Sequence, residues 1–315
     1  MTAAIEITGL HKRYGRRVAV HRLDLTVRPG AVFGLIGANG AGKTTTLRTL
    51  VDIIRPTSGR VHVLGADPRH AGPALRRRIG YVPGELRLEG RATGIRLLSF
   101  YAGVSGERGA GSGTLHTARE LADRLGVDLG RPVRSLSKGN KQKIGLIQAF
   151  MHRPELLILD EPTSGLDPLV QREFLALVRE ARDAGQTVLL SSHVLSEIQQ
   201  SADEVAVLAS GRVVAEGDVA SLRLGSIRRV RVRLAGADAG AARDRFTRVP
   251  GVEALDVTPR DGAALLAATI EGDIDPFVKA IAEYKVHDLV VEEPDLEESV
   301  LRLYGQDARD EGDAR

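Results

Sequence analysis

Eight consecutive residues near the N-terminus have the types and spacing of a phosphate-binding loop, G-x-x-x-x-G-K-[ST]. The residues of the loop are Gly37, Ala38, Asn39, Gly40, Ala41, Gly42, Lys43 and Thr44, followed by Thr45. The glycines allow a tight turn whose N–H groups converge on phosphate oxygens, together with the N-terminus of the next helix, which we expect over residues 45–54. Lys43 would reach the β and γ phosphates, and the Thr44 hydroxyl would bind Mg²⁺. A glycine-rich structural turn is the alternative, but every constrained position of the pattern is filled.

Two adjacent acids, Asp160 and Glu161, follow the short apolar run 156–159. Such an unbroken run is typical of a fully buried strand, so the acids would emerge at its carboxyl end. Ligands bind at that end of an open parallel sheet. We therefore expect Asp160 to contact Mg²⁺ or its water, and Glu161 to act as a general base or to polarise the attacking water. Without the phosphate loop, both acids could equally cap a helix or face solvent.

A third motif lies between the first two in the chain and consists of a small-residue turn that opens a helix. Its residues are Leu136, Ser137, Lys138, Gly139 and Asn140. The exposed N–H groups and the dipole of a helix N-terminus attract anions, so Ser137 and this helix would form a second anion-binding surface.

The order of these motifs resembles that of the ATP-binding subunits of ABC transporters, over roughly the first 220 residues. The family signature Leu-Ser-Gly-Gly-Gln corresponds to residues 136–140. The resemblance implies a switch histidine at His193 and an adenine-stacking aromatic at Tyr14. It also implies a D-loop formed by Ser164, Gly165, Leu166 and Asp167. Without the other motifs, a histidine after a strand is more often a hydrogen-bonded structural residue than a catalytic one. A single tyrosine likewise more often packs against other side chains than binds a nucleotide.

In this family the signature closes on ATP that the opposite cassette holds. The sequence has one phosphate loop and one signature, so a complete site implies a homodimer or a pair of cassettes facing head to tail. ATP would join the two cassettes and hydrolysis would release them. The resemblance thus implies ATP and Mg²⁺ as cofactors, and a transmembrane subunit on a separate chain as partner.

The sequence departs from the family pattern at three positions. Lys138 replaces the first signature glycine, and Asn140 stands where glutamine is usual. Gly84 follows Pro83, where the family usually has a glutamine that reaches Mg²⁺. Either Glu85 takes over that role or water completes the coordination, and we favour water.

The composition limits the class of protein. The 315 residues are 43% hydrophobic, carry a formal net charge of +3 and include no cysteine, which excludes disulfides and cysteine metal sites. Neither a signal peptide nor a run of about 18 apolar residues is evident. We expect a cytoplasmic protein that is peripheral at the inner face of the cell membrane, with any pore on another chain.

The expected fold is an α/β P-loop NTPase cassette over residues 1–224. It would combine a parallel core sheet, an antiparallel layer and a helical subdomain at about 86–152. The antiparallel layer is expected from alternating segments at 5–10, 23–27 and 60–64. The helical part would contain helices at 95–101 and 115–125, joined by a flexible glycine-rich loop at 103–113. By resemblance this part receives a helix of the membrane subunit near Arg87 and Leu88, with ordinary solvent exposure as the alternative.

A smaller C-terminal domain is expected at 225–304, with a disordered tail at 305–315. Its predicted order of elements, βαββαβ, indicates a ferredoxin-like α+β domain. Its first strand alternates Val230, Val232 and Leu234 with arginines. Because no aromatic residues are interleaved for base stacking, we expect a solvated or salt-bridged face and no nucleic acid. The acidic segment 292–298 resembles the ending of ATPases from antibiotic and multidrug exporters.

Three functions are compatible with these features. The first is an ATPase that powers export through a separate membrane subunit. The second is an ABC-class ATPase that acts on ribosomes or nucleic acid, although such proteins usually have two cassettes in one chain or a long coiled coil, and neither is present. The third is nucleotide sensing without turnover, which only the missing glutamine supports.

Overall fold

The computed structural model describes residues 3–88, 90–104, 113–219, 227–260 and 262–292. The chain divides into two compact units between Asp218 and Val219, and each unit has its own hydrophobic core. The predicted domain boundary at 224/225 and the predicted tail at 305–315 lie outside the described residues.

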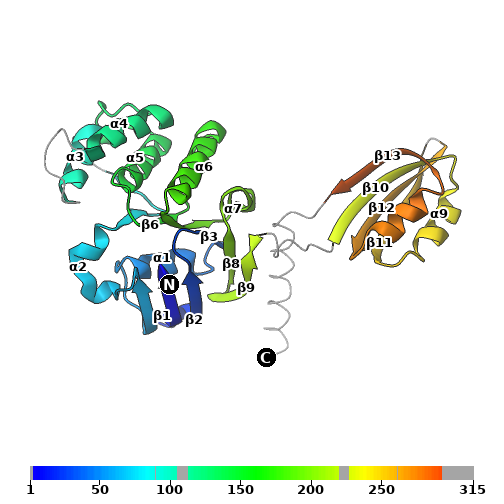
Figure 1. The fold of residues 1–315 in the computed structure, drawn as a ribbon, viewed down its shortest axis with the longest axis horizontal. Helices are drawn as coiled ribbons and strands as arrows, with labels where there is room; N and C mark the ends of the chain where they lie inside the picture. The colour runs from blue at the N-terminus through cyan, green and yellow to red at the C-terminus, as the bar shows by residue number, and fades with distance from the viewer. Residues whose placement is uncertain (1–2, 89, 105–112, 220–226, 261, 293–315) are drawn as a thin grey trace. The chain divides into compact units, whose positions relative to one another are not determined.

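A six-stranded sheet in the order β5-β6-β7-β3-β8-β9 forms the centre of the first unit (Figure 1). The first five strands of this order run parallel, and β9 pairs antiparallel with β8. The strands are β3 (Val32–Gly37), β5 (Ile79–Val82), β6 (Leu156–Asp160), β7 (Thr187–Ser192), β8 (Glu204–Ala209) and β9 (Arg212–Asp218). Because β3, β6 and β7 are parallel neighbours, their carboxyl ends meet at one edge of the sheet. The predicted parallel core is confirmed.

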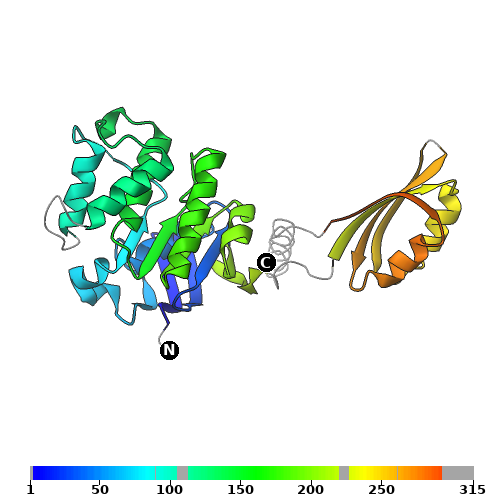
Figure 2. The same cartoon turned by 45° about the horizontal axis from the view of Figure 1, so that its top comes forward.

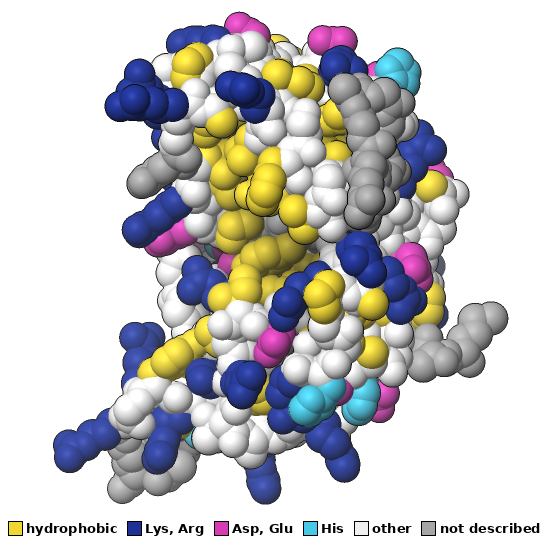
Figure 3. Space-filling view, turned by 90° about the vertical axis from the view of Figure 1, so that its left-hand side faces the viewer, with side chains coloured by type: hydrophobic (Ala, Val, Ile, Leu, Met, Phe, Trp, Pro, Cys, Tyr) yellow, Lys and Arg dark blue, Asp and Glu magenta, His cyan; other side chains and the backbone are white. Residues whose placement is uncertain are grey.

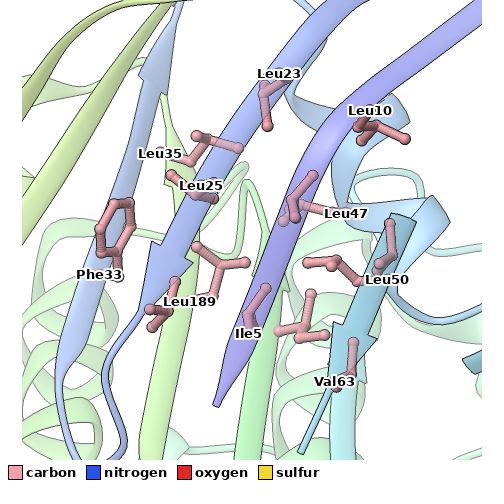
Figure 4. Packing of buried hydrophobic residues seen from close by; sticks show 14 of the residues in the cluster. Ile5, Leu10, Leu23, Leu25, Phe33, Leu35, Leu47, Leu50, Val63 and Leu189 are labelled. Carbon is pink, nitrogen blue, oxygen red and sulfur yellow. The ribbon is translucent and has the colours of Figure 1, made fainter. Parts of the chain in front are cut away.

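A second layer lies against this sheet. It is an antiparallel sheet in the order β2-β1-β4, formed by β1 (Ile5–Tyr14), β2 (Arg17–Val27) and β4 (Ser58–Val63). One buried cluster joins this layer, β3, β7 and helix α1 (Lys43–Leu50), as Figure 4 shows. Ten of its members are Ile5, Leu10, Leu23, Leu25, Phe33, Leu35, Leu47, Leu50, Val63 and Leu189. Burial of each such side chain contributes roughly 1.5–3 kcal/mol, so α1 is firmly held on the sheet.

The first unit also contains further helices. They are α2 (Pro68–Arg76), α3 (Gly94–Val104), α4 (Gly113–Leu125), the 3₁₀ turn η1 (Val133–Ser135), α5 (Lys138–Phe150), α6 (Pro168–Asp183) and α7 (Leu195–Ser201). In Figures 1 and 2, α3, α4 and α5 lie together, away from the blue strands β1 and β2. In the part of the chain that is described, no helix combines the length and the apolar character needed to cross a membrane.

One arginine ties the helical group to the rest of the first unit. Arg124 of α4 contacts Glu173 at 2.6 Å and Glu180 at 2.7 Å, both on α6. The hydrogen bonds to these carboxylates, that to Glu180 above all, raise the pKa of Arg124, and Arg124 in turn lowers the pKa of Glu180. The contact therefore joins α4 to α6 by charge as well as by packing.

The structure corrects two details of the prediction. Helix α1 ends at Leu50, before the predicted end of the helical segment at Ile54, because Asp52 adopts the left-handed conformation with φ of +56°. Helix α3 extends through Gly103 to Val104, beyond the predicted end at 101. Of the predicted glycine-rich loop, residues 105–112 lie outside the described residues.

The second unit has the predicted βαββαβ order. Its elements are β10 (Ile227–Ala235), α9 (Ala239–Phe246), β11 (Val252–Arg260), β12 (Ala263–Glu271), α10 (Asp275–Ile281) and β13 (Lys285–Glu292). The sheet order β11-β12-β10-β13, with every pair antiparallel, is that of a ferredoxin-like fold. Val230, Val232 and Leu234 are buried, whereas Arg231 is exposed and pairs with Glu292 at 2.5 Å.

Candidate nucleotide-binding site

The predicted phosphate loop connects β3 to α1 as expected. Gly42 caps α1 with φ of +109°, and a Cβ at this position would lie 2.8 Å from the Ala19 carbonyl oxygen. Only glycine fits such a backbone without strain. Lys43 is only 6% exposed, and its Nζ donates to the Gly37 carbonyl oxygen at 2.5 Å. The loop is thus folded around its own lysine, with the N-terminus of α1 directly behind it.

A cavity of about 460 Å³ opens beside this loop. The described residues that line it are Tyr14, Arg17, Ala19, Ala38, Asn39, Gly40, Gly42, Lys43, Thr44, Thr45 and Glu161. Tyr14 lies at the end of β1, is 48% exposed, and has Lys12 Nζ at 4.9 Å from its ring centroid. The predicted phosphate loop, the predicted aromatic and the predicted base therefore share one cavity, which has room for a nucleotide on the scale of small-molecule pockets.

Asp160 lies at the carboxyl end of β6, behind Thr44. Its Oδ1 accepts hydrogen bonds from the Thr44 hydroxyl at 3.2 Å and the Ser191 hydroxyl at 2.7 Å. The side chain is fully buried, and within the described residues no hydrogen-bond partner reaches Oδ2. A buried carboxylate oxygen without a partner is costly, so a site with this donor set fits a bound cation. Burial, and then the negative charge of Asp160, raise the pKa of nearby Tyr81.

Glu161 contacts both the phosphate loop and the predicted switch histidine. Its Oε1 lies 3.2 Å from Lys43 Nζ, and its Oε2 lies 2.5 Å from His193 Nδ1. Its φ is +48°, a conformation that residues other than glycine rarely adopt and that occurs often at functional sites. The Glu161 N–H donates hydrogen bonds to the Ser191 carbonyl and hydroxyl oxygens, and these hydrogen bonds stabilise the backbone conformation of Glu161.

Gly84 packs directly on the Asp160 carboxylate. A Cβ at position 84 would lie 3.0 Å from Asp160 Oδ2. The neighbouring Glu85 does not approach the site: its side chain is 75% exposed and lies 3.4 Å from Arg87. This arrangement therefore gives no support to Glu85 as a replacement for the missing glutamine.

The signature and the D-loop form a second group. The Ser137 hydroxyl caps α5 by accepting from the Asn140 N–H at 3.2 Å. A Cβ on Gly139 would lie 2.8 Å from the Gly165 carbonyl oxygen, and the Lys138 stem lies beside Gly165. Leu136 and Leu166 are buried. Further members are Ser164, whose N–H donates to the Glu161 carbonyl, and Asp167, which caps α6.

The phosphate-loop residues and the signature residues are separate within one chain, because the described lining of the 460 Å³ cavity includes no residue of 136–140.

Several contacts of the site were not predicted from the sequence. Arg17 and Ala19 line the cavity, Ser191 holds Asp160, and the Gln142 side chain donates to the Pro162 carbonyl at 3.0 Å. The one signal for Ser191 was its place at the end of an apolar strand.

Known proteins match this sequence and this fold. The family model described as "ABC transporter" matches residues 20–164. The daunorubicin resistance ATP-binding protein DrrA3 of Streptomyces coeruleorubidus is 36% identical, over 97% of this chain and 97% of that protein.

Two solved structures share the fold of the first unit. The structure of an ATP-binding subunit of an ABC transporter has a TM-score of 0.66 and 29% identity, over 70% of this chain and 92% of that one. A dimeric ATP-binding cassette in a post-hydrolysis state, with ADP and phosphate bound, has a TM-score of 0.61 and 21% identity, over 68% of this chain and 98% of that one. These relatives lend no support to an ATPase that acts on ribosomes or nucleic acid. By sequence and by fold, this chain belongs to the ATP-binding proteins of the ABC transporter family and is an ATPase of that family.

Proposed function

We propose that this chain is one of two cassettes that bind ATP head to tail and power export of an antibiotic-like compound through a separate membrane subunit. One observation carries the proposal: Glu161 contacts both His193 and Lys43 of the phosphate loop, while no signature residue is among the described residues that line the 460 Å³ cavity beside this loop. The name of the 36% identical relative, a daunorubicin resistance protein, supports the export of such a compound.

Asp160 and Thr44 are the residues that would hold Mg²⁺. The unpartnered Oδ2 of Asp160 supplies a hard, charged oxygen, and the Thr44 hydroxyl lies next to the same carboxylate. When bound, Mg²⁺ neutralises negative charge on the phosphates. Ser191 holds the other oxygen of Asp160 and so orients the carboxylate.

Glu161 would change partners when ATP binds. The triphosphate would compete for Lys43, whose present partners include Glu161 and loop carbonyl oxygens. Released from Lys43, the Glu161 carboxylate would be available to accept a proton from the attacking water. His193 would then stabilise the γ-phosphate through its imidazole, and Tyr14 would stack against adenine. Asn39, Ala38 and the glycines would supply backbone N–H groups to the phosphates.

The signature residues 136–140 would close on the ATP of the partner cassette. Ser137 and the N-terminus of α5 present N–H groups, and no acidic residue lies in the first turn of this helix. The D-loop packs against the signature through Gly165, and the Ser164 N–H donates to the Glu161 carbonyl oxygen, so the D-loop would report the state of one site to the other.

The membrane subunit would dock on the face that carries α3. Figure 3 looks onto the side where α2 and α3 lie and shows hydrophobic side chains gathered near its centre. Phe100 and Val104 of α3 are 65% and 61% exposed. Of the two residues expected at this contact, Arg87 is exposed but Leu88 is buried. The apolar surface offered to the membrane subunit would therefore come from α3 and not from Leu88.

Substitution of Gly84 by alanine is expected to weaken Mg²⁺ binding, so that turnover requires a higher Mg²⁺ concentration. The new Cβ would lie 3.0 Å from Asp160 Oδ2, the oxygen we assign to the metal. Overpacking costs about 1–3 kcal/mol, which corresponds to a roughly 5- to 150-fold higher half-saturating Mg²⁺ concentration. Titration of ATPase rate with Mg²⁺ measures this shift. The matched control is Gly103→Ala, where a Cβ meets nothing within 4 Å, and equal shifts in both variants would contradict the assignment.

The proposed assembly can be tested with the Glu161→Gln variant, which should bind ATP without turning it over. At saturating Mg-ATP, light scattering should show a dimer, and a dimer should be absent with ADP. In extracts of its native host, the chain should also co-purify with a multi-span membrane protein, and not with RNA that resists high salt. A strictly monomeric variant, with that membrane protein supplied, would overturn the proposal.

A further inference from the structure

A buried carboxylate links the two loops that flank the proposed γ-phosphate position. Glu197 of α7 is only 6% exposed. Its Oε2 accepts hydrogen bonds from the Thr163 hydroxyl and the Ser192 hydroxyl, each at 2.9 Å. Both hydroxyl side chains are buried, with Thr163 5% and Ser192 1% exposed. We refer to these three residues as the Glu197 cluster.

The cluster connects segments that are far apart in the chain. Thr163 lies between Glu161 and the D-loop, which begins at Ser164. Ser192 ends β7 immediately before His193, and its hydroxyl oxygen also accepts from the Val194 N–H at 2.9 Å. A continuous path of hydrogen bonds therefore runs from the turn that carries His193, through Glu197, to the start of the D-loop.

Packing alone does not account for a carboxylate at this position. Among the described residues, Glu197 takes part in none of the ion pairs. A buried carboxylate without a cation costs free energy that an apolar side chain of similar volume avoids. Its two hydroxyl donors compensate part of this cost, and they do so only while both loops keep their present positions.

The other connection between these loops is exposed and has to be exchanged during the proposed cycle. His193 is 54% exposed in its side chain and contacts Glu161 directly. If the Glu161 carboxylate instead contacts the attacking water and His193 contacts the γ-phosphate, the contact between Glu161 and His193 is lost. None of the three residues of the Glu197 cluster is among the described residues that line the cavity, so the cluster can persist through this exchange.

We infer that Glu197 is a positioning residue for ATP hydrolysis, which holds the His193 turn and the D-loop in register while Glu161 and His193 change partners. This inference rests on the proposed function, because it assigns Glu197 to the same site. Glu197 acts through Thr163 and Ser192 and is not itself a catalytic residue.

The test compares Glu197→Gln with Glu197→Met in the 315-residue chain, with Mg-ATP. The glutamine amide oxygen can still accept both hydroxyl hydrogens, whereas methionine fills a similar volume without an acceptor for them. Glu197→Gln should keep kcat within about 3-fold of the parent, and Glu197→Met should lower it by about 10- to 100-fold. The KM for ATP should change by less than about 3-fold in both, since Glu197 lies outside the cavity lining.

A second variant separates positioning from loss of structure. Thr163→Val removes one hydrogen-bond donor to Glu197 at nearly constant volume. In the parent chain this substitution should lower kcat, whereas in the Glu197→Met background it should have little further effect on kcat. Additive losses would overturn the inference, as would equal losses in Glu197→Gln and Glu197→Met, or a Glu197→Met variant with unchanged kcat.

Hydrogen exchange gives a readout that does not depend on turnover. In Glu197→Met, amides of 163–167 and 192–195 should exchange about 10-fold faster, while in Glu197→Gln they should keep the parent rates. Unchanged exchange in the methionine variant would overturn the inference. Because this measurement needs no ATPase activity, failure of the proposed export cycle would remain distinguishable from failure of the Glu197 assignment.

Discussion

Replacing Glu161 with glutamine is expected to lower ATP turnover by about two to four orders of magnitude, the usual contribution of a positioned general base. The amide has nearly the same shape, so the contact to His193 can be kept while the proton acceptor is lost. The positive φ of Glu161 and its backbone bonds to Ser191 do not depend on the carboxylate. ATP should therefore still bind, and measurements of kcat and of nucleotide affinity on the same preparation will separate the two effects.

The control for this prediction is Glu85→Gln. Glu85 is 75% exposed, pairs only loosely with Arg87 at 3.4 Å, and lies beside the position of the missing glutamine. Its substitution should leave kcat within about 2-fold, as expected for an exposed ion pair. If Glu161→Gln also retained the parent turnover, Glu161 would have to be removed from its catalytic role.

Substitution of Lys43 by methionine is expected to weaken ATP binding by roughly 30- to 1000-fold. Methionine keeps most of the volume of this 6% exposed side chain but removes its charge. Loss of one member of a buried charge contact costs about 2–4 kcal/mol. The same change leaves Glu161, 3.2 Å away, without its cation. Calorimetric titration with ATP and Mg²⁺ will measure the loss of affinity.

A lysine of the second unit provides the matched control. Lys279 is 76% exposed in its side chain and pairs with Asp275 on the surface of α10. Lys279→Met should leave ATP affinity unchanged, because surface ion pairs of this kind contribute little. Equal affinities in the Lys43 and Lys279 variants would show that the buried amine does not bind phosphate.

The sequence by itself determined the local parts of this protein. Residues 37–44 specify the phosphate loop because glycine is required where the backbone turns to the left-handed side, as at Gly42. The apolar run 156–159 specifies a buried strand, and the βαββαβ order specifies the ferredoxin-like unit, which the strand pairing confirms. Patterns of this kind depend on a few neighbouring residues, so they can be recognised without any knowledge of distant contacts.

Only the tertiary structure decided how these parts meet. The contact of Gly84 with Asp160, the bridge of Glu161 between Lys43 and His193, and the burial of Glu197 all join segments that lie far apart in the chain. No local pattern encodes these contacts, because they depend on which strand ends become neighbours when the parallel sheet forms. The order β6-β7-β3 brings Asp160, Ser191 and the phosphate loop to one edge, and that order is fixed by packing of the whole unit.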